Sequence, residues 1–147
     1  MIQIIPMDET HVAQIARLEE QCFSDPWSEK SIASELNNPL SCWLVAMDGD
    51  SLAGYVGSQT VMGETDMMNI AVDPGFRRRG IAEQLVNRLV EVLRKNESRC
   101  LTLEVRASNE PAQKLYEKLG FVLVGKRPKY YRNPREDAFI LRKEWEI

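Results

Sequence analysis

The sequence has 147 residues, of which 44% are hydrophobic and 28% are charged. These values are ordinary for a soluble globular protein and predict one domain over residues 1–147. No apolar run reaches the roughly 20 residues that a membrane span requires, and the first residues lack the pattern of a secretion signal, so we expect a cytoplasmic protein. The net charge of −3 argues against a domain devoted to the nucleic-acid backbone, and we expect no direct nucleic-acid function.

The cysteines and the histidine give no sign of a disulfide framework or a metal site. Cys22, Cys42 and Cys100 are odd in number, widely spaced and free of any C-x-x-C pair. His11 is the only histidine, and no cysteines or carboxylates cluster around it in the sequence. We therefore expect reduced thiols and no metal.

The first forty residues predict one strand and two helices. Residues 2–6 are rich in isoleucine and form the strand, and Asp8 can cap a helix whose apolar positions run to residue 22. In that helix, Glu19 and Glu20 are predicted to face away from the apolar side. Ser28 is a good cap for a short second helix, which ends at residues 37–39.

A series of strands and one long helix follows. Residues 43–47 and 52–61 flank the hairpin signal Asp48-Gly49, and a third strand returns over residues 65–72. Residues 81–93 carry a broad apolar stripe at helical spacing, which predicts the longest helix.

The last third of the chain predicts a strand, a helix and two more strands. Residues 100–106 alternate in polarity, which puts Glu104 on the face opposite the leucines. Asn109 begins a helix that Gly120 ends. Strands are predicted at 121–124 and 138–141, with a basic, tyrosine-containing loop between them. This order of elements is typical of an α/β protein with a mixed sheet covered by helices.

The stretch from residue 70 to residue 89 reads as strand, anion-binding loop and helix. An apolar run ends at the turn Asp73-Pro74-Gly75, and three arginines and Gly80 precede the helix. Helix N-termini carry free N–H groups and a partial positive charge, so this loop is suited to a phosphate group. The chain lacks the G-x-G-x-x-G pattern of dinucleotide sites and the Gly-Lys-Ser/Thr of a P-loop. A solvated charge run remains the alternative reading.

The pattern Arg77-x-x-Gly80-x-Ala82 resembles the (Gln/Arg)-x-x-Gly-x-(Gly/Ala) signature of the GNAT N-acetyltransferases, which bind acetyl-coenzyme A. Residues 103–109 and 112–121 are similar to those of the RimI-type subgroup, which acetylates the N-terminal alanine of a ribosomal small-subunit protein. Further similarity lies at residues 22–28 and 130–138. The resemblance implies the GNAT fold, a central, mostly antiparallel sheet of about seven strands flanked by about four helices.

The resemblance also implies the residues of the site. Glu104 is the implied general base for the attacking amine, and Tyr116 is the implied acid for the leaving thiol; the alternatives are a solvated carboxylate and a core tyrosine. A strand bulge near Ile70 is implied by analogy alone. The implied acetyl-CoA-binding residues are Ile70, Ala71, Val72, Arg77, Arg78, Arg79, Gly80, Ile81, Ala82, Glu83 and Asn109. The implied substrate-binding residues are Phe23, Trp27, Tyr130 and Tyr131.

Three functions remain open at this point. The leading one is acetylation of the N-terminus of a ribosomal protein with acetyl-CoA as co-substrate. A GNAT enzyme that acts on other N-termini, lysines or small amines is the second. An acetyl-CoA sensor or assembly partner without turnover is the third. The sequence does not predict the oligomeric state.

Overall fold

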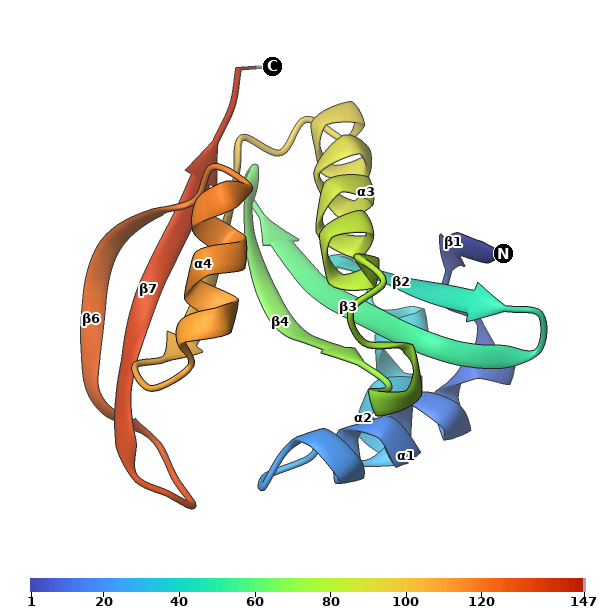
Figure 1. The fold of residues 1–147 in the computed structure, drawn as a ribbon. Coiled ribbons are helices and arrows are strands. Elements are labelled where there is room, and N and C mark those ends of the chain that lie inside the picture. Colours follow the sequence, from blue (N-terminus) through green and yellow to red (C-terminus); the bar gives the residue numbers. More distant parts are fainter. Residues whose placement is uncertain (147) are drawn as a thin grey trace.

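A computed structural model describes residues 1–146, which form a seven-stranded sheet in the order β1-β2-β3-β4-β5-β7-β6 (Figure 1). The strands are β1 (Ile2–Pro6), β2 (Ser41–Asp48), β3 (Ser51–Val61), β4 (Glu64–Val72), β5 (Cys100–Arg106), β6 (Val122–Tyr131) and β7 (Glu136–Glu144). The helices are α1 (Val12–Cys22), α2 (Glu29–Ser34), α3 (Ile81–Lys95) and α4 (Glu110–Lys118), with short 3-10 turns at Glu9–His11, Glu35–Asn37 and Pro74–Phe76. The predicted mixed sheet and order of elements are confirmed. No helix of this described part is long and apolar enough to cross a membrane.

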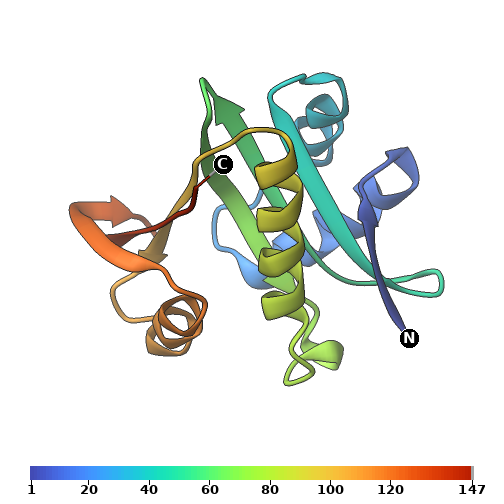
Figure 2. The ribbon, with the colours of Figure 1, turned by 90° about the horizontal axis from the view of Figure 1, so that it is seen from above.

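The two faces of the sheet carry different helices (Figure 2). The core on one face is built from α3, α4 and the leucines of β5, including Leu85, Leu89 and Leu103. The core on the other face is built mainly from α1 and α2, with Ile15 and Ile32 fully buried. The helices therefore sandwich the sheet, and side chains that alternate along a strand enter different layers.

β4 and β5 form the parallel pair of the sheet, and this pair is very short. Pairing covers Glu64 with Cys100, Thr65 with Leu101 and Asp66 with Thr102, and it ends there. Beyond it the two strands diverge, so the sheet opens into a V whose arms are visible in Figure 1. One backbone edge of β4, from Met67 to the end of the strand, consequently faces the opening without a partner from β5.

β4 also contains a β-bulge at the point where it leaves β5. Asn69 pairs with Gly57 of β3 and Met67 pairs with Ser58, so Met68 is an extra residue. The bulge interrupts the alternation of side chains: Met67 packs in the core under α3, whereas Met68 packs on the α1 side. The bulge implied near Ile70 is therefore present, two residues earlier.

Two expectations about local structure are wrong. Glu19 does not face away from the protein, because it is fully buried beneath α1, where three donors surround its carboxylate. The basic, tyrosine-containing segment is not a loop, because β6 continues through it to Tyr131 alongside β7. Both errors concern polar residues that partners from other elements hold in place, Glu19 through Asn69 and Tyr55 and the end of β6 through its neighbour β7.

Gly57 lies opposite the bulge and beneath the indole ring of Trp43. A methyl group at Gly57 would lie 2.4 Å from Trp43 Cε2, and the indole itself stacks on Tyr55 with 5.8 Å between ring centroids. We expect Gly57→Ala to lower the free energy of unfolding by about 1–3 kcal/mol, the usual cost of overpacking. Urea denaturation measures this change.

Gly125→Ala is the matched control, because the nearest atom to its added methyl would be the flexible end of Ile140 at 3.4 Å. It should change stability by less than about 0.5 kcal/mol. Equal losses in the two variants would show that the contact with Trp43 does not determine the requirement for glycine.

Candidate functional site

The loop before α3 leaves the start of that helix free for a ligand. Asp73 Oδ1 accepts a hydrogen bond from Gly75 N at 2.8 Å and so shapes the turn that precedes the arginines. Gly80 then adopts a left-handed conformation with φ of 71°, and no side chain of the described residues caps the helix there. A methyl group built on Gly80 would meet nothing within 4 Å, so a ligand has open access to this backbone.

The three arginines surround this helix start and are exposed. Arg77 Nε donates to the carbonyl oxygen of Val72 at 3.3 Å, and the Arg79 guanidinium lies over the Phe76 ring at 5.2 Å. Arg78 has a positive φ of 67°. Free N–H groups, the positive end of the helix dipole and three guanidinium groups together suit a diphosphate, so these residues fit the phosphate-bearing part of coenzyme A.

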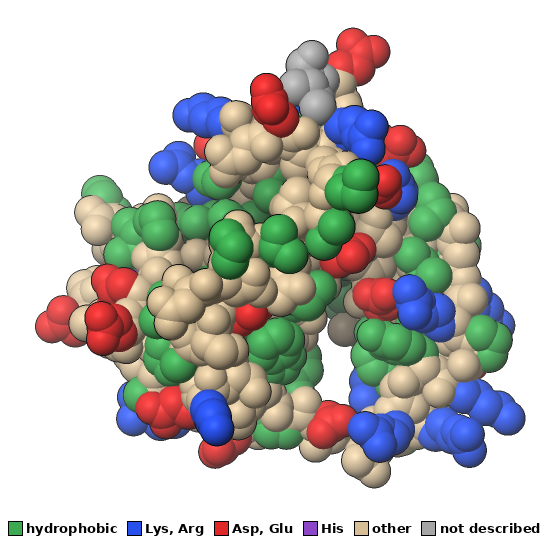
Figure 3. All heavy atoms as spheres, turned by 180° about the vertical axis from the view of Figure 1, so that it is seen from behind, with side chains coloured by type: hydrophobic (Ala, Val, Ile, Leu, Met, Phe, Trp, Pro, Cys, Tyr) green, Lys and Arg blue, Asp and Glu red, His purple; other side chains and the backbone are tan. Residues whose placement is uncertain are grey.

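A cavity of about 120 Å³ lies where β4 and β5 diverge. Its lining combines residues from both arms of the V with one residue of α4. The lining residues are Met67, Met68, Asn69, Ile70, Leu103, Glu104, Tyr116, Tyr130 and Tyr131. Figure 3 shows the face that carries α1 and α2, where an open notch separates two lobes and Lys and Arg side chains gather at one lower corner.

Glu104 reaches the cavity because β5 alternates. Leu103 and Val105 enter the core under α3 and α4, so the Glu104 side chain points to the opposite face. Burial raises the pKa of Glu104, Arg127 lowers it and Asp66 raises it further. Arg127 Nε lies 3.4 Å from Glu104 Oε1 and forms an ion pair with it. The net direction is upward, which makes this carboxylate a better proton acceptor than an exposed glutamate.

Tyr116 reaches the same cavity from α4 on the other face of the sheet. The residue is 5% exposed, and its ring packs edge-to-face on Phe121 with 5.4 Å between centroids. Burial raises the pKa of the Tyr116 hydroxyl far above its usual value, and Tyr131 adds to this rise. The hydroxyl therefore keeps its proton at neutral pH and is available as a donor.

The four aromatic residues implied for substrate binding lie in two places. Tyr130 and Tyr131 line the cavity at the end of β6. Phe23 and Trp27 pack instead against the core beneath α1, where Trp27 meets Trp43 edge-on at 5.4 Å. They belong to the loop that follows α1, and they are not among the residues that line the cavity.

Asn109 has the capping role that the sequence predicts. Its Oδ1 accepts a hydrogen bond from Ala112 N at 3.2 Å at the start of α4. The side chain is exposed on the surface of the molecule. Capping therefore fixes the helix that carries Tyr116.

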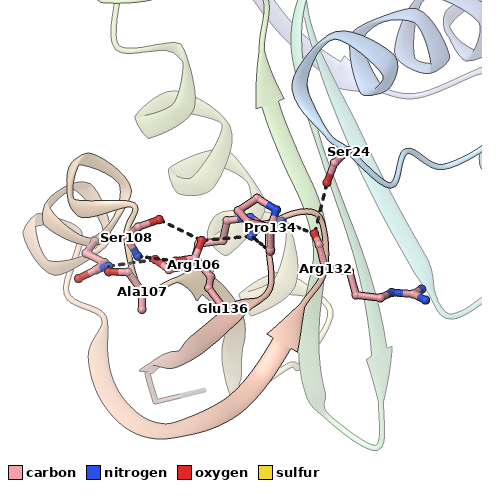
Figure 4. A network of polar contacts seen from close by, with 8 residues as sticks. Ser24, Arg106, Ala107, Ser108, Arg132, Pro134 and Glu136 are labelled. Carbon is pink, nitrogen blue, oxygen red and sulfur yellow. Dashed lines mark hydrogen bonds and ion pairs between the residues drawn. The ribbon is translucent and has the colours of Figure 1, made fainter.

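Arg106 organises the turn between β6 and β7, a role that was not predicted from the sequence (Figure 4). Its guanidinium donates to the carbonyl oxygens of Pro134 at 2.9 Å and Arg132 at 3.0 Å, and it pairs with Glu136 at 3.1 Å. It also lies 4.4 Å from the centroid of the Tyr131 ring. The alternation of β5 was the available signal, because it puts Arg106 on the same face as Glu104.

The same turn touches the loop after α1 across the opening of the V. Ser24 Oγ donates to the carbonyl oxygen of Arg132 at 3.5 Å (Figure 4). Arg132 Nη2 also lies 3.3 Å from Asp25 Oδ2. Both contacts join segments about a hundred positions apart in the sequence, so sequence patterns could not reveal them. They join the two arms at the end away from the β4–β5 pair.

No group of three or more histidine, cysteine, aspartate or glutamate side chains within residues 1–146 is placed to hold a metal ion. The titratable side chains that line the cavity are the carboxylate of Glu104 and the phenols of Tyr116, Tyr130 and Tyr131. That set suits proton transfer to and from a reacting amine and thiol.

Comparison with known proteins assigns the chain to a family. Residues 12–121 match the acetyltransferase (GNAT) family. A protein from Escherichia coli (strain K12), named ribosomal protein bS18-alanine N-acetyltransferase, is 36% identical over 143 residues, which cover 96% of each chain. A protein from Bacillus subtilis (strain 168), whose name assigns the same activity provisionally, is 40% identical over 135 residues, covering 91% of this chain and 87% of that one.

The fold gives the same assignment. The crystal structure of the ribosomal-protein-S18-alanine N-acetyltransferase from Escherichia coli superposes with a TM-score of 0.92 and 34% identity, over 100% of this chain and 96% of that one. The seven-stranded sheet within residues 1–146, with its short β4–β5 pair, is thus the GNAT fold. The chain belongs to the GNAT acetyltransferase family and is an acetyl-CoA-dependent N-acetyltransferase.

Proposed function

We propose that this enzyme transfers the acetyl group of acetyl-CoA to the α-amine of an N-terminal alanine of ribosomal protein bS18. One observation carries the chemistry: Glu104 and Tyr116 line one cavity from opposite faces of the sheet, at the point where β4 and β5 diverge. The names of the relatives at 36% and 40% identity support the substrate. The residue roles rest on the geometry.

Residues at the start of α3 bind the phosphate-bearing part of the co-substrate. The free N–H groups that follow Gly80, with residues 77–79 around them, hold the pyrophosphate of acetyl-CoA. Asn109, exposed at the start of α4, contributes a further contact. This end anchors the co-substrate and takes no part in bond making.

The bulged part of β4 binds the reacting acetyl end. Asp73 N donates to the carbonyl oxygen of Ala53, and Ala71 pairs with Tyr55 in the same ladder with β3. Because N–H groups alternate between the two edges of a strand, Ile70 and Val72 present theirs on the free edge, which has no partner from β5. A backbone N–H fixed beside the thioester oxygen stabilises the negative charge that develops during attack, without any reorganisation. The oxyanion donor is therefore a backbone N–H of β4 that remains unpaired because β5 diverges from this part of the strand.

Glu104 removes a proton from the incoming amine, directly or through water. A chain-terminal amine has a pKa of about 7.7–8.0, so a large fraction is protonated near neutrality and a modest base suffices. Burial raises the pKa of Glu104 and moves it toward the value that suits a base at neutral pH. Tyr130 and Tyr131 bound the space in which the first residues of the peptide lie.

Tyr116 donates a proton to the departing thiolate of coenzyme A. Its raised pKa keeps the hydroxyl protonated until the leaving group develops negative charge. Donation then leaves a phenolate, which solvent or the released proton neutralises. The acid and the base act from opposite faces of the sheet, so each contacts its own side of the reacting carbonyl.

The substrate assignment is tested with a peptide that has the alanine-initiated N-terminal sequence of bS18. Incubation with the enzyme and acetyl-CoA should add one acetyl group at the α-amine, as read by fragment mass spectrometry. The control is the same peptide with its α-amine blocked in advance, which should remain unmodified. Acetylation of lysine side chains in both peptides would contradict the assignment, and so would the absence of any acetylation in either peptide.

Tyr116→Phe tests the proton donor. The change keeps the ring that packs on Phe121, so stability should be retained, whereas the loss of a general acid should lower kcat by about 100-fold to 10,000-fold. Steady-state kinetics with a thiol-release assay measure kcat, and titration with acetyl-CoA should give an unchanged Kd. An unchanged kcat would remove Tyr116 from the mechanism.

Arg127→Gln tests the electrostatics of Glu104. Arg127 lowers the pKa of Glu104, so its removal raises that pKa and decreases the ionised fraction of the base as the pH falls. The ratio of the variant's kcat/KM to that of the wild type should therefore decrease from about pH 8 to about pH 5, while the amine's own titration cancels in the ratio.

The control for this measurement is Arg88→Gln. Arg88 lies 3.4 Å from Glu91 on the exposed side of α3, the same separation as in the Arg127–Glu104 pair. Arg88→Gln removes the same charge at a site away from the cavity. The ratio of its kcat/KM to that of the wild type should therefore be constant with pH. A constant ratio for both variants would show that Arg127 does not set the protonation of the base.

A further inference from the structure

Glu19 is a buried carboxylate for which the proposed mechanism has no use. It lies in α1 and is 0% exposed. No cation of the described residues pairs with it, and burial is the main cause of its raised pKa. A buried carboxylate without a counterion is expensive, since desolvation costs several kcal/mol before hydrogen bonds offset it.

Three donors from three different segments surround this carboxylate. Its Oε1 accepts a hydrogen bond from Trp27 N at 2.8 Å. Its Oε2 accepts one from Asn69 Nδ2 at 2.7 Å and another from the Tyr55 hydroxyl. The partners belong to the loop after α1, to β4 and to β3, so a single side chain joins elements up to 50 positions away in the sequence.

Asn69 connects Glu19 to the reacting end of the site. It follows the extra residue Met68 of the bulge, and it lines the cavity together with Glu104 and Tyr116. Because the bulge puts Met68 and Asn69 on the α1 side in succession, the Asn69 amide needs an acceptor there, and Glu19 provides it. The hydrogen bond therefore fixes the bulge from outside the sheet.

Trp27 connects Glu19 to the other arm of the V. Trp27 is the last residue of the loop of residues 23–27, and its backbone N–H donates to Glu19. Ser24 and Asp25 of the same loop contact Arg132 in the turn between β6 and β7. Arg106 holds that same turn and stacks on Tyr131 of the cavity wall. Glu19 thus sits between the acetyl-binding strand and the loop that closes the peptide side.

We propose that Glu19 is a positioning residue: it holds the β4 bulge through Asn69 and the residue 23–27 loop through Trp27, so that the peptide amine and the acetyl group meet in a fixed geometry. This inference rests on the proposed function, because it concerns the alignment of those two substrates. Displacement of a reacting group by about 1 Å costs up to about 100-fold in rate. Glu19 touches neither substrate.

Glu19→Gln tests this proposal, because it keeps the shape of the side chain and changes its hydrogen bonding. A glutamine has one oxygen acceptor, whereas Glu19 accepts from three donors, so either Trp27 or Asn69 loses its partner. We expect kcat/KM for the alanine peptide to decrease by about 10-fold to 100-fold with an unchanged Kd for acetyl-CoA. The melting temperature should not decrease enough to explain this loss of kcat/KM, because the variant no longer buries a carboxylate.

Glu20→Gln is the matched control, since Glu20 is the next residue of α1 and is exposed. It removes the same charge and should leave the kinetics unchanged. Wild-type kcat/KM for Glu19→Gln would overturn the positioning role, and so would a loss of activity that a lower melting temperature fully accounts for. If the wild-type enzyme does not acetylate the peptide, the proposed function fails, and the role of Glu19 falls with it.

Asn69→Ala, alone and combined with Glu19→Gln, tests the same link from the other side of the hydrogen bond. If Glu19 acts through Asn69, the loss of the double variant will be smaller than the product of the two single losses. If Glu19→Gln is poorly folded, the single variant Asn69→Ala decides the case, because it leaves α1 intact, and a wild-type kcat/KM for it would contradict the link. Fully multiplicative losses would contradict the link.

Discussion

The short parallel pairing of β4 with β5 is the constraint on which the site depends. Three residue pairs hold the strands together, and everything beyond Asp66 and Thr102 diverges. An unpaired strand edge normally costs hydrogen bonds, and a bulge adds a further defect. In this protein the two defects coincide, and the cavity between the strands has the unpaired backbone edge of β4 on one side and the side chains of Glu104 and Tyr116 on the other. Adding further ladder bonds between these strands would remove the site.

The electrostatics of the cavity separate its acid from its base. Burial raises the pKa of both Glu104 and Tyr116, but the consequences differ because one group is charged in its useful form and the other is neutral. The upward shift makes Glu104 more basic and keeps Tyr116 protonated. Arg127, which pairs with Glu104, limits how far the pKa of Glu104 can rise. The same burial makes Tyr116 a weaker acid, so its proton transfer depends on the negative charge that develops on the departing thiolate.

The features that the sequence predicted well are set by local chemistry. Gly80 at the start of α3, Asn109 at the start of α4 and the alternation that puts Glu104 on the face opposite Leu103 each depend on a few neighbouring residues. Glu19 was misread because an amphipathic pattern assigns a glutamate to the solvent side, while its partners Asn69 and Tyr55 lie far along the chain. The extension of β6 to Tyr131 was missed for a different reason, because its polar composition disfavours a strand while pairing with the neighbouring β7 outweighs that preference.

The arrangement of the two arms explains why a buried carboxylate is useful at Glu19. The arm before the divergence carries the bulge and the loop of residues 23–27, and the arm after it carries Glu104, Tyr116 and Tyr131. On the α3 and α4 side, one apolar core joins the two arms. Across the opening of the V, Ser24 and Asp25 contact Arg132 on an exposed surface, where such contacts are individually weak. At this end, the width of the cavity depends more on how rigidly each arm holds its own parts. A carboxylate with three donors fixes the bulge and the loop to each other, and an apolar residue of similar size, although cheaper to bury, would leave both of them free to shift.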